Sequence, residues 1–254
     1  MATERILKSI LWGLAAPLWL LSILMDRFLS DALRFDLERC LELTSLLGRS
    51  IPAPFVDAVI LAEDHRNALH PGVDVLAMIR SAWIWLRCGQ VQGASTIEQQ
   101  FVRVATNRKE RTVRRKVREQ MLALMLVRRA PKRRIASAYL AVAFYGSDSI
   151  GLQGLRRQFG RNLEIVSFSQ ALSIVAQLKY PRPRNPSKEW SSKLANRIDA
   201  LHSLGRDTAN NAFQVNFDPL PLLLLQKQAS PQTHLNVDVS HQEEQVATST
   251  GAVL

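Results

Sequence analysis

Apolar residues recur along most of this chain at the three- and four-residue spacing of helices that bury one face. One nearly continuous apolar run comes first, and shorter amphipathic runs follow, several of them closed by a glycine. The pattern predicts a mostly α-helical protein, with helices over 6–25, 28–48, 54–63, 75–86, a short run from 96, 113–125, 135–145, 167–178 and 192–204.

The first run, 6–25, is long enough to cross a bilayer, which takes about 20 apolar residues, and Lys8 is its only charged residue. A cleaved signal peptide is the rival interpretation, but no small-x-small cleavage site follows the run. We therefore expect residues 1–28 to form an uncleaved transmembrane anchor. Basic residues flank the run on both sides, so charge assigns it no orientation.

Three stretches follow the anchor. Residues 29–53 mix apolar and charged positions and end in a proline-containing linker, so we expect an amphipathic juxtamembrane segment that lies on the bilayer or packs on the domain. Residues 54–205 hold the remaining helical runs and form one domain of ordinary size. Residues 206–254 are rich in Asn, Gln, Ser and Thr without sustained periodicity, so we expect a low-complexity, disordered tail.

The formal net charge of this 254-residue chain is +11. Such an excess indicates an anionic partner: a nucleic acid, an acidic membrane or a phosphorylated substrate. The two cysteines have no CxxC spacing and the five histidines no metal-binding spacing. The sequence therefore predicts neither a disulfide framework nor a dedicated metal site.

Glu63 continues the apolar stripe of Val56, Val59 and Ile60, and it stands where the helix opens into the turn at Pro71-Gly72. A carboxylate on a core-facing stripe is partly desolvated, which makes it a better base. A solvated helix end is the plainer interpretation of the same residues.

A glycine turn at 93–96 leads into the next helix, and Ser95 with Glu98 has the spacing of a capping box. The segment is either a well-capped helix start or an anion site at a helix N-terminus. The chain then becomes very basic from 103 to 134. Within this run Arg115, Lys116 and Glu119 share one helix face. The run is a solvated charged face, a nucleic-acid arm or a pyrophosphate site.

Five motifs occur in order along the chain: E-D-H-R-N-A-L-H-P-G-V-D at 63–74, G-A-S-T-I-E-Q-Q at 93–100, R-K-V-R-E at 115–119, K-R-R-I-A-S-A-Y-L-A at 132–141 and G-L-Q-G-L-R-R-Q-F-G-R at 151–161. In order and wording they resemble the glycosyltransferase domain of class A penicillin-binding proteins and of the monofunctional peptidoglycan glycosyltransferases. The resemblance covers about 54–204.

This resemblance implies a lysozyme-like helical fold of two lobes. It also implies an enzyme that polymerises lipid II into glycan strands, with inversion and release of undecaprenyl pyrophosphate. The protein is expected to cross the bacterial cytoplasmic (inner) membrane once, with its catalytic domain on the extracytoplasmic, periplasmic side. No S-x-x-K triplet occurs in the sequence, so we expect no transpeptidase activity.

Carried over position by position, the resemblance makes Glu63 the base that takes the proton of the acceptor hydroxyl. Glu119 becomes a second catalytic glutamate that organises the pyrophosphate site. The positions that match substrate-binding residues are Asp64, Ser95, Gln99, Gln100, Arg103, Arg115 and Lys116.

The resemblance also implies partners and cofactors. The expected partners are lipid II, the growing glycan chain and the membrane, with other cell-wall synthesis proteins as further candidates and nucleic acid excluded. No cofactor is obligatory, although divalent cations such as Mg²⁺ or Mn²⁺ often assist this family, and no protein metal cage is visible.

The chain departs from the family pattern at several motif positions. In the first two motifs Asn67 replaces Phe, Ala94 replaces Gly and Glu98 replaces Thr, and after them Arg103 replaces Lys. In the fourth motif Ser137 replaces Glu and Ala141 replaces Asn, and further along Leu155 replaces Ala and Gln170 replaces Glu. These departures favour an alternative function, a catalytically impaired relative that binds lipid II or glycan or scaffolds a cell-wall complex. A lysozyme-like hydrolase is a third interpretation.

Overall fold

The structure is a computed structural model that describes residues 2–90, 93–108, 110 and 112–216. It divides into two units, 1–211 and 212–254, and the residues of the sites discussed below all lie in the first. Residues 217–254, most of the predicted tail, lie outside the described part of the chain.

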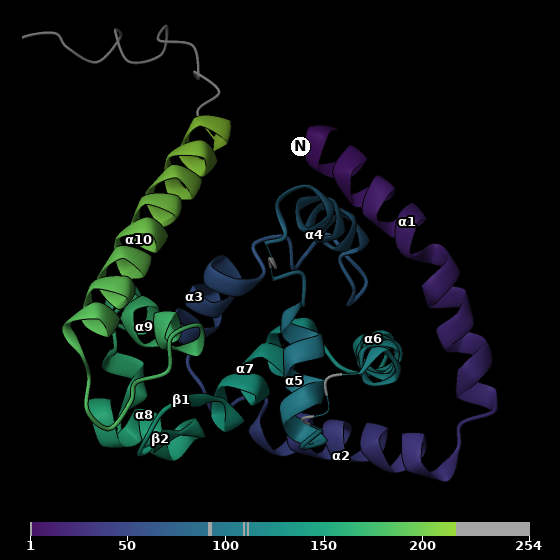
Figure 1. The fold of residues 1–254 in the computed structure, drawn as a ribbon, viewed down its shortest axis with the longest axis horizontal. Coiled ribbons are helices and arrows are strands. Elements are labelled where there is room, and N and C mark those ends of the chain that lie inside the picture. The colour runs from purple at the N-terminus through teal and green to yellow at the C-terminus, as the bar shows by residue number, and fades with distance from the viewer. Residues whose placement is uncertain (1, 91–92, 109, 111, 217–254) are drawn as a thin grey trace, which may run out of the picture. The chain divides into compact units, whose positions relative to one another are not determined.

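The described residues are mostly helical, as the sequence predicts (Figure 1). In chain order the elements are α1 (Ala2–Arg27), α2 (Asp31–Leu47), α3 (Ala53–Glu63), α4 (Val75–Cys88), α5 (Ile97–Ala105), α6 (Val113–Val127), α7 (Lys132–Val142), β1 (Phe144–Gly146), β2 (Ser149–Ile150), α8 (Gly151–Phe159), the 3₁₀ turn η1 (Leu163–Ile165), α9 (Phe168–Val175), the 3₁₀ turn η2 (Ala176–Leu178) and α10 (Lys188–Asn216).

Helix α7 lies at the centre of the core, where α2, α3, α5 and α8 all pack against it. Its Ile135 and Leu140 are fully buried, and Ala136 and Ala138 between them let the neighbouring helices approach closely. Helix α6 covers α5 and α2 with a face that includes the buried Leu122. Burial of this apolar surface is the main stabilising contribution to the domain.

Helix α1 is long and apolar enough, over Thr3–Arg27, to cross a membrane. It contacts α4 and α6, and near its end Asp26 pairs with Arg128 at 2.5 Å and Arg129 at 2.6 Å. Helix α2 packs on α5, α6 and α7. Of the two positions predicted for the amphipathic segment, the structure therefore shows packing on the domain.

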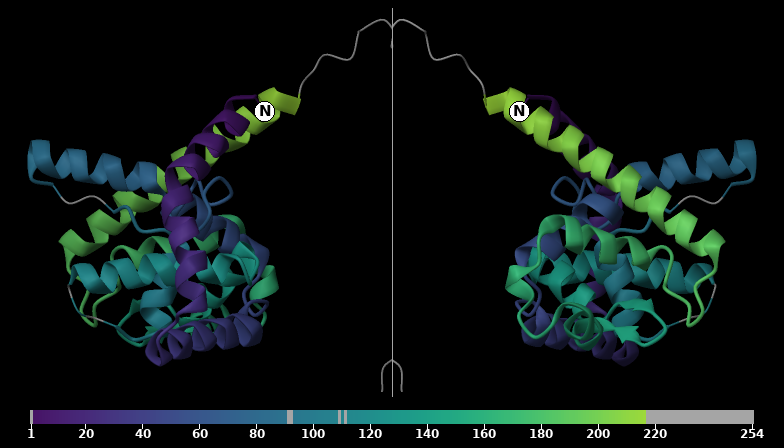
Figure 2. Two further views of the ribbon diagram at one scale, coloured as in Figure 1. Left: turned by 90° about the vertical axis from the view of Figure 1, so that its right-hand side faces the viewer. Right: turned by 90° about the vertical axis from the view of Figure 1, so that its left-hand side faces the viewer.

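Helix α4 begins at Asp74, whose carboxylate accepts the amide hydrogen of Ala77 at 2.8 Å, and ends at Gly89 in the left-handed conformation (φ 65°). Figure 2 shows α4 running outward from the helical core. Several of its large apolar side chains are exposed: Ile79, Trp83, Trp85 and Leu86.

The apolar run 135–145 is not one helix, which corrects the prediction. Helix α7 ends at Val142, and Phe144–Gly146 forms a strand that pairs antiparallel with β2. The chain reverses here because the Ala143 carbonyl accepts the amide hydrogen of Gly151 at 2.7 Å. Apolar composition alone cannot distinguish a short buried strand from a helix end.

The last helix begins earlier and ends later than the predicted 192–204, because α10 runs through Gly205 to Asn216. Gly205 does not terminate it. A Cβ atom at this position would lie 3.3 Å from Leu61, so the glycine allows α10 to approach that residue closely.

Candidate active site

Glu63 is the last residue of α3, and its side chain is only 16% exposed. Its Oε2 accepts a hydrogen bond from the Gln100 amide at 3.3 Å, and its Oε1 pairs with Arg197 of α10 at 3.3 Å. A carboxylate has about four lone-pair sites, so both oxygens retain acceptor capacity. Glu63 is therefore a held, mostly buried carboxylate and not a solvated helix end.

Gln100 is oriented by Tyr139 of α7, whose hydroxyl donates to Gln100 Oε1 at 2.7 Å. Burial, and next the charge of Glu63, raise the pKa of Tyr139 well above its usual value, although Arg103 opposes the shift. The phenol therefore remains a protonated donor, and it leaves the amide hydrogens of Gln100 for Glu63. Neither contact is local in sequence, which is why the residue pattern did not predict Tyr139.

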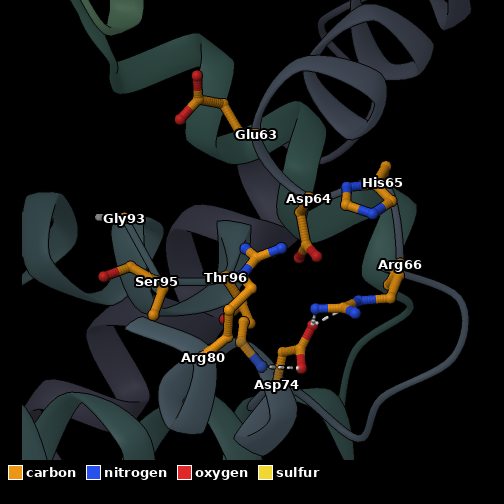
Figure 3. Close-up of a pocket in the computed structure, with 11 residues that line it drawn as sticks. Glu63, Asp64, His65, Arg66, Asp74, Arg80, Gly93, Ser95 and Thr96 are labelled. Carbon is orange, nitrogen blue, oxygen red and sulfur yellow. Dashed lines mark hydrogen bonds and ion pairs between the residues drawn. The ribbon is translucent and has the colours of Figure 1, made fainter. Parts of the chain in front are cut away.

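Asp64, the next residue, points away from Glu63 (Figure 3). It is buried and accepts hydrogen bonds from His70 Nε2 at 3.0 Å, from Asn67 at 3.1 Å and from the backbone amide of Ile97 at 3.3 Å. Burial by itself raises the pKa of Asp64. The hydrogen bond and the charge of His70, the hydrogen bond from Asn67 and the charge of Lys132 outweigh burial, so the pKa of Asp64 lies below its ordinary value. The carboxylate fixes the motif loop to the start of α5.

We expect Asp64→Asn to destabilise the protein by about 1.5–3 kcal/mol at pH 7, the range for hydrogen bonds to a buried charged group. Because the folded pKa is depressed, the carboxylate stabilises the protein above its unfolded pKa near 3.8 and loses this contribution as the pH falls through the folded pKa. Urea unfolding at pH 7 and pH 3 measures the difference. Equal destabilisation at both pH values would contradict the assignment.

Glu98 belongs to the same buried network and not to a capping box, which corrects the predicted pairing of Ser95 with Glu98 at the start of this helix. Thr96 is the N-cap of α5 and accepts from the Gln99 amide, so Ser95 lies one residue too early. Glu98 is fully buried, accepts from Asn67 at 2.9 Å and pairs with Lys132 at 3.2 Å. Two of the departures from the family motifs, Asn67 and Glu98, thus contact each other.

Three cations surround the buried Glu119, and we call them the cation cluster: Arg103, Arg115 and Lys116. Arg103 binds Glu119 at 3.0 Å, Arg115 binds it one helical turn away, and Lys116 lies 3.6 Å from it. One carboxylate among three cations leaves a net positive charge. The prediction that Arg115, Lys116 and Glu119 share a face is confirmed.

Lys116 connects the cation cluster to the start of α5. Its ammonium donates to Gln99 Oε1 at 2.7 Å and to Ser95 Oγ at 2.9 Å. Burial lowers the pKa of Lys116, and the charge of Glu119 opposes this shift. An ammonium that has lost part of its water interacts more strongly with an incoming anion than a solvated one does.

Glu63 and Arg103, one member of the cation cluster, line a hollow of about 600 Å³, called the cleft below. Of the predicted residues, Glu63, Ser95, Gln100 and Arg103 line it. Asp64, Gln99 and Glu119 are buried, and they do not line the cleft, nor do Arg115 and Lys116. The structure adds residues that the sequence did not single out: His65, Arg80, Lys179 and Arg197. These residues are isolated basic side chains on separate helices and turns, so they carry no recognisable spacing and no sequence signal indicated them.

The fourth-motif departures lie outside the lining of the cleft. Ser137 is buried at the junction of α2 and α3, where its hydroxyl donates to Leu47 O and accepts from Ile51 N, both at 3.2 Å. Ala141 is a core residue that is 8% exposed. Neither replacement removes a charged group from the cleft.

One group among the described residues has the spacing of metal ligands: Asp64, His70 and Glu98, whose donor atoms lie within 4.8 Å of one another. The Lys132 ammonium lies 3.2 Å from Glu98 and 3.3 Å from His70 Nδ1. It neutralises one of the two carboxylate charges in this group. The absence of a dedicated metal site remains a prediction from the sequence.

Comparison of the sequence with known proteins identifies the family of this chain. The family model described as Transglycosylase matches residues 41–204. The chain is 28% identical over 205 residues to penicillin-binding protein 1A of Rickettsia prowazekii, covering 78% of the chain and 25% of that relative. It is 36% identical over 159 residues to penicillin-binding protein 1B of Vibrio cholerae, covering 60% and 20%. The chain thus spans about a quarter or less of these relatives.

Proposed function

We propose, from the premise that this chain belongs to the Transglycosylase family, that it is a peptidoglycan glycosyltransferase that polymerises lipid II. The observation that carries the proposal is the cleft, where a mostly buried glutamate and a cationic wall face one hollow. A general base and an anion-stabilising wall are the two groups that sugar transfer from a pyrophosphate requires.

In this mechanism Glu63 takes the proton from the 4-hydroxyl of the acceptor sugar. The oxygen then forms a bond to the anomeric carbon of the growing chain as the bond from that carbon to the pyrophosphate oxygen breaks, with inversion. Gln100 and Arg197 hold the Glu63 carboxylate in place throughout.

Negative charge grows on the leaving undecaprenyl pyrophosphate, and Arg103, on the cleft wall, is positioned to stabilise it. Arg115 and Lys116 stand behind Arg103 on the same carboxylate, Glu119. Glu119 holds the cation cluster together, because its negative charge offsets the repulsion among the three cations. Divalent cations, where they assist, would accompany the pyrophosphate of the substrate.

The alternative is a catalytically impaired relative that binds lipid II or glycan. It rests on the altered fourth motif, but Ser137 and Ala141 do not line the cleft. The retained Glu63, with two partners and residual exposure, favours an enzyme that turns over. The absence of transpeptidase activity remains a prediction from the sequence.

The proposed location is the bacterial cytoplasmic membrane, crossed once by α1, with the domain on the outer side. The 25-residue apolar stretch Thr3–Arg27 supports the crossing. The side follows from the proposed substrate, because lipid II polymerisation takes place outside the cytoplasm. The growing glycan and other cell-wall synthesis proteins are the proposed partners.

The test is incubation of the full chain in detergent with labelled lipid II, followed by separation of polymer from monomer. We expect glycan strands and free undecaprenyl pyrophosphate. Lipid II that binds but is not polymerised would instead support the impaired relative. Release of fragments from finished sacculi without use of lipid II would support a hydrolase.

A further inference from the structure

A second hollow, of about 340 Å³, lies between the β1–β2 hairpin, α8 and the segment 177–184. We call it the hairpin hollow, and none of its lining residues lines the cleft. Its polar and charged lining includes Asp148, Ser149, Arg157, Gln177, Arg182 and Arg184. Figure 1 shows the hairpin and α8 next to each other at this end of the domain.

One buried polar atom in the hairpin hollow lacks a partner among the described residues, the Oγ atom of Ser149. Gln177 also lines the hollow and is only 8% exposed, and its side-chain amide is open to the hollow. Buried polar groups are almost always paired, so the unpaired Ser149 hydroxyl beside the Gln177 amide indicates that a ligand completes the hollow.

The rim of the hollow is cationic. The guanidinium groups of Arg182 and Arg184 have no carboxylate partner in the described part of the chain, and Arg157 donates only to the backbone carbonyl of Asp148, at 2.8 Å. The backbone beneath them is fixed, because Arg182 exchanges hydrogen bonds with Tyr145 O at 2.9 Å and Ser147 N at 2.7 Å. The arginines therefore project from an ordered frame.

We propose that the hairpin hollow binds a carboxylate-bearing peptide. Arginine forks bind carboxylates in pairs of parallel hydrogen bonds, and the side-chain amide of Gln177 offers both a donor and an acceptor to a peptide group. A fully ionised phosphate or a phosphodiester has only acceptors and would leave the Gln177 carbonyl unpaired. It would also face the carboxylate of Asp148, which can accept a peptide N–H instead.

The position of the hollow relates it to the cleft. Gln177 lines the hollow and Lys179 lines the cleft, and two residues span at most about 7 Å of chain. One short segment thus separates the two sites. The glycan substrate of the proposed function carries a peptide, and the identification of the bound peptide with this one rests on that proposed function. The binding of an acidic peptide at the hairpin hollow does not depend on it.

The test uses the full chain in detergent and calorimetric titration with the peptide Ala-Glu-Ala, its form with both carboxyl groups amidated, and inorganic pyrophosphate. We expect saturable binding of the acidic peptide and not of its amidated form, whereas any binding of pyrophosphate belongs to the cleft and should not depend on the arginines of the hairpin hollow. The double variant Arg182→Gln/Arg184→Gln should weaken it at least tenfold. Arg156→Gln, on the same helix as Arg157 but outside the hollow, is the matched control and should bind as the wild type does.

Gln177→Met separates a binding role from a structural one. Replacing a buried amide with an apolar side chain of similar size should leave the unfolding temperature equal or higher, while peptide binding falls at least tenfold. A lower unfolding temperature with unchanged binding would overturn the proposal. So would the absence of peptide binding in the wild type, or binding of the amidated peptide as tight as that of the acidic peptide. Pyrophosphate binding that the Arg182→Gln/Arg184→Gln variant weakens as much as peptide binding would also overturn it.

The two proposals fail separately. If the wild type polymerises lipid II but does not bind the peptide, the hairpin site is rejected and the proposed function stands. If the wild type binds the peptide but does not polymerise lipid II, the proposed function is rejected and the hairpin site stands.

Discussion

Replacing Glu63 by Gln is expected to slow lipid II polymerisation by about two to four orders of magnitude, the range for loss of a general base. The amide cannot take the proton from the acceptor hydroxyl, so the attacking oxygen must form its bond to carbon while still protonated. Gln keeps the side-chain length and an oxygen that can accept the Arg197 hydrogen bond. The measurement is the initial rate of strand formation from labelled lipid II.

Glu164→Gln is the matched control, because Glu164 is an exposed glutamate outside the cleft. It should polymerise at the wild-type rate. Binding of lipid II to Glu63→Gln should be close to that of the wild type, since the cation cluster is untouched. A Glu63→Gln rate above about a tenth of the wild-type rate would reject Glu63 as the base.

The second large effect is expected on stability. Lys132→Met should lower the free energy of unfolding by about 3–5 kcal/mol, the range for leaving one partner of a buried ion pair. Glu98 is fully buried and Lys132 is its only cation among the described residues, so the variant leaves a carboxylate held by Asn67 alone. Lys132 also donates to the carbonyls of Asn67 and His70. Chemical denaturation measures the loss.

A second substitution isolates the charge from these other contacts. Glu98→Gln on the Lys132→Met background removes the unpaired charge and keeps an acceptor for Asn67, so much of the loss should be recovered. Lys193→Met, at an exposed pair with Glu189, should produce no measurable change. If Lys132→Met costs under about 1 kcal/mol, the pair does not behave as a buried ion pair.

Helical spacing predicted most of the architecture, because amphipathic periodicity depends on local burial. It also placed Arg115, Lys116 and Glu119 together, since they lie within one turn of α6. It assigned Glu98 to a capping box because capping spacing is local, whereas its actual partner Asn67 is 31 residues away.

The rest of the site required tertiary structure. Arg197 reaches Glu63 across 134 residues, and no single-residue pattern on α10 distinguishes it from the other basic residues of that helix. The role of Ser137 was also hidden, because its hydroxyl joins α2 to α3 over separations of 90 and 86 residues. Motif resemblance proposed the residues of the site, and packing decided which of them line the cleft: Glu63, Ser95, Gln100 and Arg103.

The Asn67 amide lies between two carboxylates and donates to both, to Asp64 at 3.1 Å and to Glu98 at 2.9 Å. This arrangement makes the two positions unequal. Phenylalanine at position 67, the residue of the family motif, would leave two buried carboxylates with no amide between them, whereas threonine at position 98 would leave Asn67 beside an uncharged neighbour. We therefore expect Asn67→Phe alone to be more harmful than Glu98→Thr alone, because only the first leaves both carboxylates without their shared donor.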